Sequence, residues 1–190
     1  MNKISKLLLC AILCLFLCSC ENAGTTEKAE NIGLEYAKCS EFGIRAAITA
    51  DYGEHVLEYD MKYSGSASQG VIEIFAPKSI AGLKVQAATS EKTKLIYDGA
   101  ELWAGELSKN GLDPVSSLPV MINQWRGGYV ESSIVERLDG GTYLAVIHSI
   151  DDSTRLLTWF DMETHLPYKA DISSDGKTVI RAVFKNVTSL

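Results

Sequence analysis

An alternation of apolar and polar residues with a period of two runs through most of the chain and constrains its fold more than any other feature. Its clearest stretch is residues 55–63, where Leu57, Tyr59, Met61 and Tyr63 alternate with charged residues. This period places the apolar side chains on one face of a β-strand. Turn sequences recur every ~8 to 12 residues, which is too short for a crossover connection, so the strands are predicted to be antiparallel.

The strands implied by this pattern number roughly ten. They are expected near residues 46–52, 55–63, 71–76, 83–87, 94–97, 101–104, 133–138, 142–148, 154–160, 168–172 and 178–184. Pro77 should end the third of them, because proline has no N–H for a further ladder bond. A sheet of this size must curl to bury one face. The predicted fold class is α+β, with a strongly curved antiparallel sheet and about two helices against its concave side.

The first helix is expected over residues 27–42, with Thr25 or Thr26 as its N-cap and Gly43 as its stop. Within it, Ile32, Tyr36 and Cys39 follow the spacing of one helical face. The helix should therefore present a single apolar stripe to the sheet.

The second helix follows from residues spaced i, i+3, i+4 and i+7, namely Leu118, Met121, Ile122 and Trp125. It opens either at Asp113-Pro114 or at Ser117, which would place Pro119 in the first turn. Gly127-Gly128 should close it. This helix is also amphipathic and should pack on the sheet.

The N-terminus has the organisation of a secretory signal. Lys3 and Lys6 precede an apolar run over residues 7–17, and the run is too short to span a membrane. Leu17-Cys18-Ser19-Cys20 then matches the lipobox of bacterial lipoproteins. We predict a lipoprotein signal peptide over residues 1–19, a flexible lipidated tether over residues 20–28 and one domain over residues 29–190. The alternative is an ordinary cleaved signal peptide.

Charge excludes one class of partner. The chain carries a formal net charge of −6, and loss of Lys3 and Lys6 with the signal would make it −8. Such a surface cannot neutralise phosphates, so nucleic acid is not expected as a partner. Membrane attachment must then come from a lipid on Cys20, which predicts a cell-membrane, lipid-anchored location on the extracytoplasmic face.

Cys39 would be the single remaining thiol after removal of the signal and lipidation of Cys20. It has no cysteine partner within the chain, so packing rather than a disulfide must hold the domain together. We interpret Cys39 as a small buried apolar residue of the first helix. A reactive thiol or an intermolecular disulfide is the alternative.

Three segments resemble the LolA/LolB superfamily of lipoprotein carriers: residues 76–83, residues 95–103 with the pattern YDG-x-x-LW, and residues 159–167 with the pattern WFD-x-x-T-x-LP. The closest likeness is to small lipoproteins of Gram-positive spore formers such as the germination lipoprotein GerS. The resemblance covers residues 43–187 and implies an incomplete antiparallel β-barrel with helices lining its hollow. That hollow holds acyl chains in LolA, whereas GerS-type members bind and support a peptidoglycan amidase.

The candidate binding residues are large apolar side chains of the predicted strands and second helix. Most large aromatic residues should fill the core, but an incomplete barrel would leave some of them along an open groove. The candidate groove-lining residues are Leu57, Tyr59, Met61, Tyr97, Trp103, Met121, Trp125 and Trp159.

Signatures of catalysis are lacking in the sequence, which has no HExxH, CxxC, GxSxG or phosphate-loop motif. We therefore expect no catalytic residue, no metal site and no cofactor. The alternative is an envelope hydrolase with an unrecognised site around His148, Asp151 or His165, which would require these groups to converge in one cleft.

The predicted function is a non-enzymatic binding module for an envelope protein partner or a hydrophobic ligand. A lipid on Cys20 would prevent the domain from shuttling, so an accessory role like that of GerS is favoured over lipid carriage. A LolA/LolB-type carrier is the first alternative. A stress-sensing domain like RseB, which would need a membrane-bound partner, is a further one.

Overall fold

The computed structural model describes residues 21–66, 69–88 and 93–189. Eleven strands in this part of the chain form a single antiparallel sheet of order β6-β5-β4-β3-β2-β1-β11-β10-β9-β8-β7. The strands are β1 (Phe42–Asp51), β2 (Val56–Gly65), β3 (Gln69–Ala76), β4 (Lys84–Ala88), β5 (Lys94–Tyr97), β6 (Ala100–Trp103), β7 (Tyr129–Leu138), β8 (Gly141–Ser149), β9 (Thr154–Asp161), β10 (Pro167–Ser174) and β11 (Lys177–Ser189). All the predicted strands are present.

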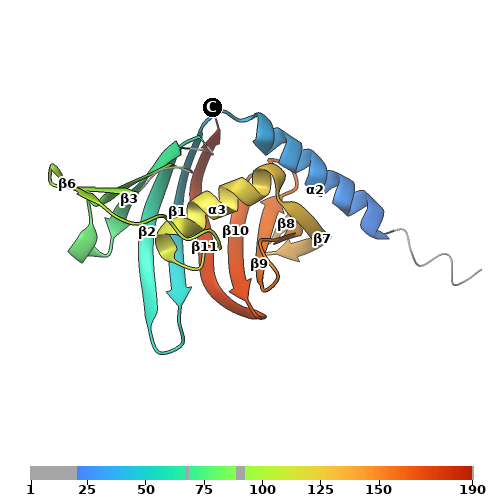
Figure 1. Cartoon of the computed structure of the whole chain (residues 1–190). Coiled ribbons are helices and arrows are strands. Elements are labelled where there is room, and N and C mark those ends of the chain that lie inside the picture. Colours follow the sequence, from blue (N-terminus) through green and yellow to red (C-terminus); the bar gives the residue numbers. More distant parts are fainter. Residues whose placement is uncertain (1–20, 67–68, 89–92, 190) are drawn as a thin grey trace, which may run out of the picture.

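The sheet curves strongly but does not close, because β6 and β7 lie at its two ends and do not pair with each other (Figure 1). Alternate residues of each strand face the concave side, as the burial pattern of β1 shows, with every second residue buried from Phe42 to Ala50. The predicted fold, a curved antiparallel sheet forming an incomplete barrel, is confirmed.

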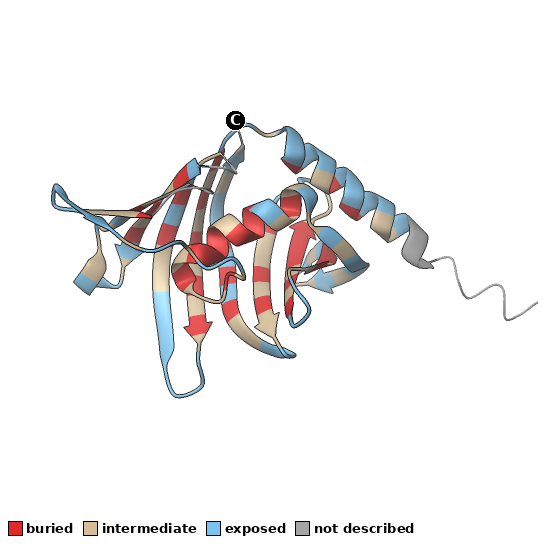
Figure 2. Ribbon diagram, in the orientation of Figure 1, coloured by how far each residue is buried: buried red, intermediate tan, exposed pale blue. Residues whose placement is uncertain are grey.

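Two α-helices lie on the concave side, α2 (Glu21–Lys38) and α3 (Pro114–Gly127), and a short 3-10 helix, η1 (Lys78–Ile80), follows β3. Figure 2 shows that the side of α3 facing the sheet is buried. The helix α2 packs against α3 and the β7 end of the sheet (Figure 1).

The boundaries of α2 differ from the prediction at both ends. It begins at Glu21 rather than at residue 27, so the tract expected to be a flexible tether is helical. Thr25 is not its N-cap: the hydroxyl of this residue donates a hydrogen bond to the carbonyl of Ser133 on β7, at 3.1 Å. At the other end, Arg126 of α3 donates to the carbonyls of Ala37 and Cys39, both at 3.2 Å. A cation at this position stabilises the C-terminal end of α2.

The opening of α3 follows the first of the two predicted starts. Asp113 is its N-cap, and the Oδ1 atom accepts the backbone N–H of Ser116 at 2.9 Å. Pro114 takes the first helical position, where a missing N–H costs little. Ser117 instead lies inside the helix and is buried.

The core centres on Trp125, which lies on the buried face of α3. Its ring makes edge contacts with Tyr36 of α2, Phe160 of β9 and Phe184 of β11 at centroid distances of 5.6, 5.8 and 5.4 Å. The indole N–H donates to the hydroxyl of Thr158, at 2.9 Å. Trp125 therefore joins both helices to the sheet with its polar atom satisfied.

Candidate binding groove

The β1–β2 hairpin projects beyond the end of β3 and leaves one edge of the sheet uncovered (Figure 1). The pairing of β2 with β3 starts at Asp60, opposite Ala76, and runs toward Gly65. In the described part of the chain, no strand pairs with residues 56–59 of β2 on that side. The first half of β2 is therefore an exposed strand edge.

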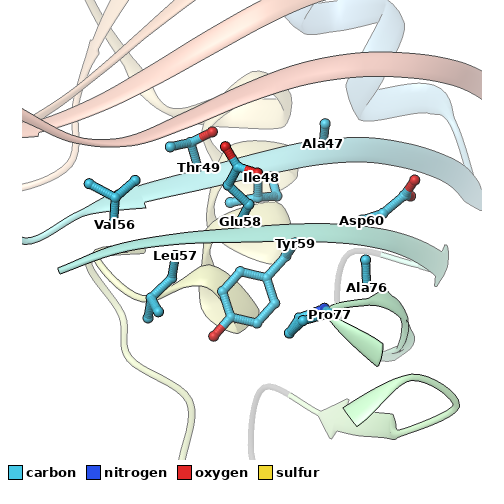
Figure 3. A pocket seen from close by; sticks show the side chains of 10 residues that line it. All are labelled: Ala47, Ile48, Thr49, Val56, Leu57, Glu58, Tyr59, Asp60, Ala76 and Pro77. Carbon is cyan, nitrogen blue, oxygen red and sulfur yellow. The ribbon is translucent and has the colours of Figure 1, made fainter. Parts of the chain in front are cut away.

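A groove with a volume of about 830 Å³ lies at this edge. It is lined by Ala47, Ile48, Thr49, Val56, Leu57, Glu58, Tyr59, Asp60, Ala76 and Pro77. In Figure 3, Leu57 and Tyr59 point to one side of the hairpin, whereas Glu58 and Asp60 point to the other. Since a cavity that touches both faces must pass around the free edge of β2, the groove follows that edge.

The apolar part of the groove is accessible to solvent. The exposed fraction is 57% for Val56 and 42% for Leu57, and Tyr59 is half-buried. The end of the hairpin is held in place by Tyr52, which donates a hydrogen bond from its hydroxyl to the carbonyl of Leu112, at 3.0 Å. This contact connects the hairpin to the loop before α3.

The two carboxylates of the groove differ in their surroundings. Asp60 accepts hydrogen bonds from Arg45 at 2.9 Å and from Lys185 at 2.7 Å, and these contacts hold its pKa below the usual range. Glu58 forms no ion pair with any residue that the structure describes. Glu58 is therefore the uncompensated charge of the groove.

Comparisons with known proteins identify the fold. No protein-family model matches the chain, and no curated protein matches it. Similar solved structures include a putative outer membrane lipoprotein-sorting protein domain from Vibrio parahaemolyticus, with a TM-score of 0.50 and 8% identity over 89% of this chain and 92% of that one. The chain has a LolA-like fold.

Two further solved structures agree with this fold. An uncharacterized conserved protein from Thermus thermophilus has a TM-score of 0.51 and 9% identity, and 87% of each chain is covered. MucB has a TM-score of 0.50 and 12% identity, over 89% of this chain and 60% of MucB. At these identities the likeness is one of fold.

The LolA-like sheet brings two of the eight candidate residues into the groove, Leu57 and Tyr59. Met61, Met121 and Trp125 do not line it, because β3 and α3 enclose them and each is at most 1% exposed. Their interpretation as groove residues is corrected to core residues.

The remaining three candidates lie elsewhere. Trp159 is buried on the convex face, where the indole N–H donates to Glu136 at 2.7 Å and the ammonium of Lys169 lies 4.2 Å from the ring centroid. Tyr97 and Trp103 are exposed on β5 and β6 at the end of the sheet and do not line the groove.

Sequence reasoning missed Val56, Glu58 and Pro77 as groove residues. Val56 and Glu58 stand in the alternating stretch that was assigned to β2, but the pattern does not show which part of the strand lacks a neighbour. Pro77 correctly indicated the end of β3. The missing information was the register, which places that end opposite the middle of β2.

The three groups of the hydrolase alternative occupy separate environments. The His148 ring is buried on β8, and Asp151 accepts hydrogen bonds from its own turn, where the N–H of Ser153 lies at 3.0 Å. His165 contacts Glu35 of α2 at 2.8 Å and lies just beyond the other end of β9. The eight residues of β9 separate the turns of Asp151 and His165 by about 25 Å, so these groups do not converge.

Cys20, the predicted lipidation site, lies outside the described residues. Cys39 follows α2 and is half-buried against the core, with its thiol donating to the carbonyl of Glu35 at 3.4 Å. Its predicted packing role is thus met only in part. Across residues 21–66, 69–88 and 93–189, no cluster of three or more metal-ligating side chains is found. Within the same ranges, neither α-helix is both long enough and apolar enough to cross a membrane.

Proposed function

We propose that this chain is a lipoprotein anchored through Cys20 to the extracytoplasmic face of the cell membrane, and that its LolA-like domain binds a protein partner of the envelope. The role would be a non-enzymatic accessory one, like that of GerS. The groove at the free edge of β2 carries this proposal, since it combines accessible apolar side chains with unpaired backbone. Exposed apolar side chains beside such an edge are typical of sites of protein association.

The packing under α3 supports a protein partner over an acyl chain. An acyl ligand needs an apolar hollow, which in this fold would lie between the helices and the concave face. Here that space is occupied by Leu118, Met121 and Trp125, each at most 1% exposed, together with the aromatic residues around Trp125. A carrier would have to displace this core to take up its cargo.

The scattered positions of His148, Asp151 and His165 support the non-enzymatic role. Two of these groups have structural partners, and the third is enclosed by the core side of the sheet. A general acid or base must reach a substrate proton in an accessible cleft. The groove itself contains two carboxylates and no histidine, cysteine or serine.

The position of α2 supports a close attachment to the membrane. It begins at Glu21, immediately after the proposed lipidated residue, and packs against β7 and α3. A lipid on Cys20 would then be joined to the domain by a helix rather than by a flexible tether. The partner is accordingly expected near the membrane surface.

Native mass spectrometry of the full-length lipoprotein, extracted gently from its own membranes, tests the proposal. We expect a complex with one protein partner, and the free chain should carry no lipid beyond its covalent anchor. Co-purification of a second, non-covalent lipid with the monomer would contradict the proposal in favour of carriage. Retention of the partner by the Cys20→Ala chain would show that binding does not require the lipid.

A further inference from the structure

The hydrogen-bond pattern of β2 shows which backbone groups face its free edge. Tyr52 donates its N–H to the carbonyl of His55 at 2.9 Å, and in an antiparallel ladder such hydrogen-bonded pairs recur every second residue. With Ala50 opposite Leu57, this alternation turns the N–H and C=O of Leu57 and Tyr59 toward β1. The N–H and C=O groups of Val56 and Glu58 must therefore point away from β1.

The hydrogen bonds between β2 and β3 independently indicate the same orientation of these backbone groups. Ser66 donates its N–H to the carbonyl of Gln69 at 2.9 Å, and Lys62 lies opposite Glu73 four residues further along. Even-numbered residues of β2 therefore face β3. Since β3 ends opposite Asp60, the N–H and C=O groups of Val56 and Glu58 point into the groove, where no described strand takes them up.

The other two sheet edges, β6 and β7, carry features that limit the addition of a strand. The edge strand β6 has four residues, and β7 carries a register shift near Val130, a hydrogen bond from Thr25 and an ion pair between Glu131 and Arg155. Short length, bulges and charges are the usual means of preventing strand addition. Exposed apolar side chains occur at all three edges, among them Trp103 on β6 and Tyr129 on β7. Within Val56–Tyr59, however, there is no register shift and no ion pair with any residue that the structure describes.

Charge decides which segment this edge would accept. On one face a bound strand would meet Leu57 and Tyr59, which favour apolar neighbours, and on the other it would meet Glu58. Asp60 is already paired with two cations, so Glu58 presents the single uncompensated charge of the groove lining. A matching segment alternates apolar residues with lysine or arginine.

We propose that the edge of β2 binds an extended, basic segment of a partner protein, which adds a strand to the sheet beside Val56–Tyr59. This inference rests on the proposed function and specifies the partner's chemistry. Main-chain hydrogen bonds to Val56 and Glu58 supply affinity, and the alternating side chains supply specificity. The free edge spans about 13 Å, the length of about four residues of an extended strand.

Hydrogen exchange on the full-length chain tests the inference with three synthetic eight-residue probes: alternating Val-Lys, alternating Val-Glu, and Val-Lys with N-methylated backbone. The Val-Lys peptide should slow exchange of the amides of Val56 and Glu58. The N-methylated peptide should give no protection, because it cannot complete the ladder. Absence of protection by Val-Lys, equal binding of the methylated peptide, or protection by a twelve-carbon fatty acid instead would each overturn the inference.

Two charge variants separate this site from a general attraction to an acidic protein. Glu58→Lys should reverse the preference from the Val-Lys to the Val-Glu peptide, with each affinity changing about two- to fivefold, as for an exposed ion pair. Glu163→Lys makes the same charge change in the exposed turn between β9 and β10 and should leave the preference unaltered. Equal effects of the two variants would contradict a specific role of Glu58.

The two proposals can fail separately. If the native partner stays bound to the Glu58→Lys chain and the Val-Lys peptide leaves Val56 and Glu58 unprotected, the edge is not the site, while the binding function stands. If the peptide adds to the edge but the extracted lipoprotein carries lipid and no protein, the proposed function fails.

Discussion

At the scale of the residue, Trp125 combines buried area with a specific hydrogen bond. Its ring contacts three aromatic residues, and its indole N–H has Thr158 as a buried acceptor. Truncation of such a side chain would leave a cavity between α3 and the sheet. The hydrogen bond also fixes the rotation of α3 relative to β9.

Replacing the acceptor Thr158 with a side chain of similar shape should lower the stability of the fold. Thr158→Val leaves the indole N–H buried and unpaired, and we expect the free energy of unfolding to fall by about 1–3 kcal/mol. Urea denaturation of the full chain measures this. In the double variant with Trp125→Phe, the effect of Thr158→Val should nearly vanish, because no donor is left unpaired. If Thr158→Val were equally destabilising in the unmodified chain and in the Trp125→Phe chain, the lost hydrogen bond would not be the cause of the destabilisation.

His148 makes stability depend on pH. Burial lowers the pKa of its ring from 6.5 to about 4. The unfolded chain therefore takes up this proton at a higher pH than the folded chain, and stability is lost as the pH falls from about 6.5 to about 4, by up to about 3 kcal/mol. The imidazole Nδ1 also has no hydrogen-bond partner among the described residues.

The measurement is urea denaturation at pH 7 and pH 4.5. His148→Leu should lose less stability than the unmodified chain between these two values, because it lacks the titrating ring. His55→Leu, at an exposed position, should behave like the unmodified chain. An unchanged pH dependence in His148→Leu would refute this role of the buried ring.

At the scale of the element, the two strands of the β1–β2 hairpin have different surroundings along their length. Leu57, Tyr59 and Met61 share one face of β2, yet exposure falls from 42% at Leu57 to 0% at Met61. The alternation in the sequence predicted that common face correctly. It could not predict the difference, which depends on where β3 ends, and therefore Met61 was expected along the groove.

The boundaries of a helix could likewise be predicted only where the signal for them is local. Asp113-Pro114 is a local signal, and α3 begins there. The contacts of α2 with Ser133 and Arg126 join residues about 90 to 110 positions apart in sequence, and no local pattern reveals them. The polar tract over residues 20–28 predicted a tether, but residues 21–28 are helical and Thr25 donates a hydrogen bond to Ser133 of β7.

The N-cap of α3 supplies a prediction at this scale. Asp113→Ala removes the acceptor for the N–H of Ser116 and should lower the free energy of unfolding by about 1 kcal/mol. Asp113→Asn retains an acceptor oxygen and should cost less. Chemical denaturation compares the two variants, and equal losses would indicate that the cap hydrogen bond contributes nothing measurable.

At the scale of the whole molecule, the account joins a proposed lipid anchor to a folded domain through α2. Labelling of cells with an alkyne fatty acid tests the anchor. The unmodified chain and Cys39→Ala should both be labelled, whereas Cys20→Ala should not be. Labelling that survives in Cys20→Ala would contradict lipidation at this residue.

The central claim is that a protein partner meets the free edge of β2 at the membrane. Site-specific photo-crosslinking in intact cells tests it most directly, with a photoreactive residue at Val56 and, as the control, at exposed Tyr129 on β7. The account predicts one discrete adduct with another protein from position 56, which is weaker in the Glu58→Lys background and does not form from position 129. Crosslinking of position 56 to lipid alone, or the same protein adduct from both positions, would contradict it.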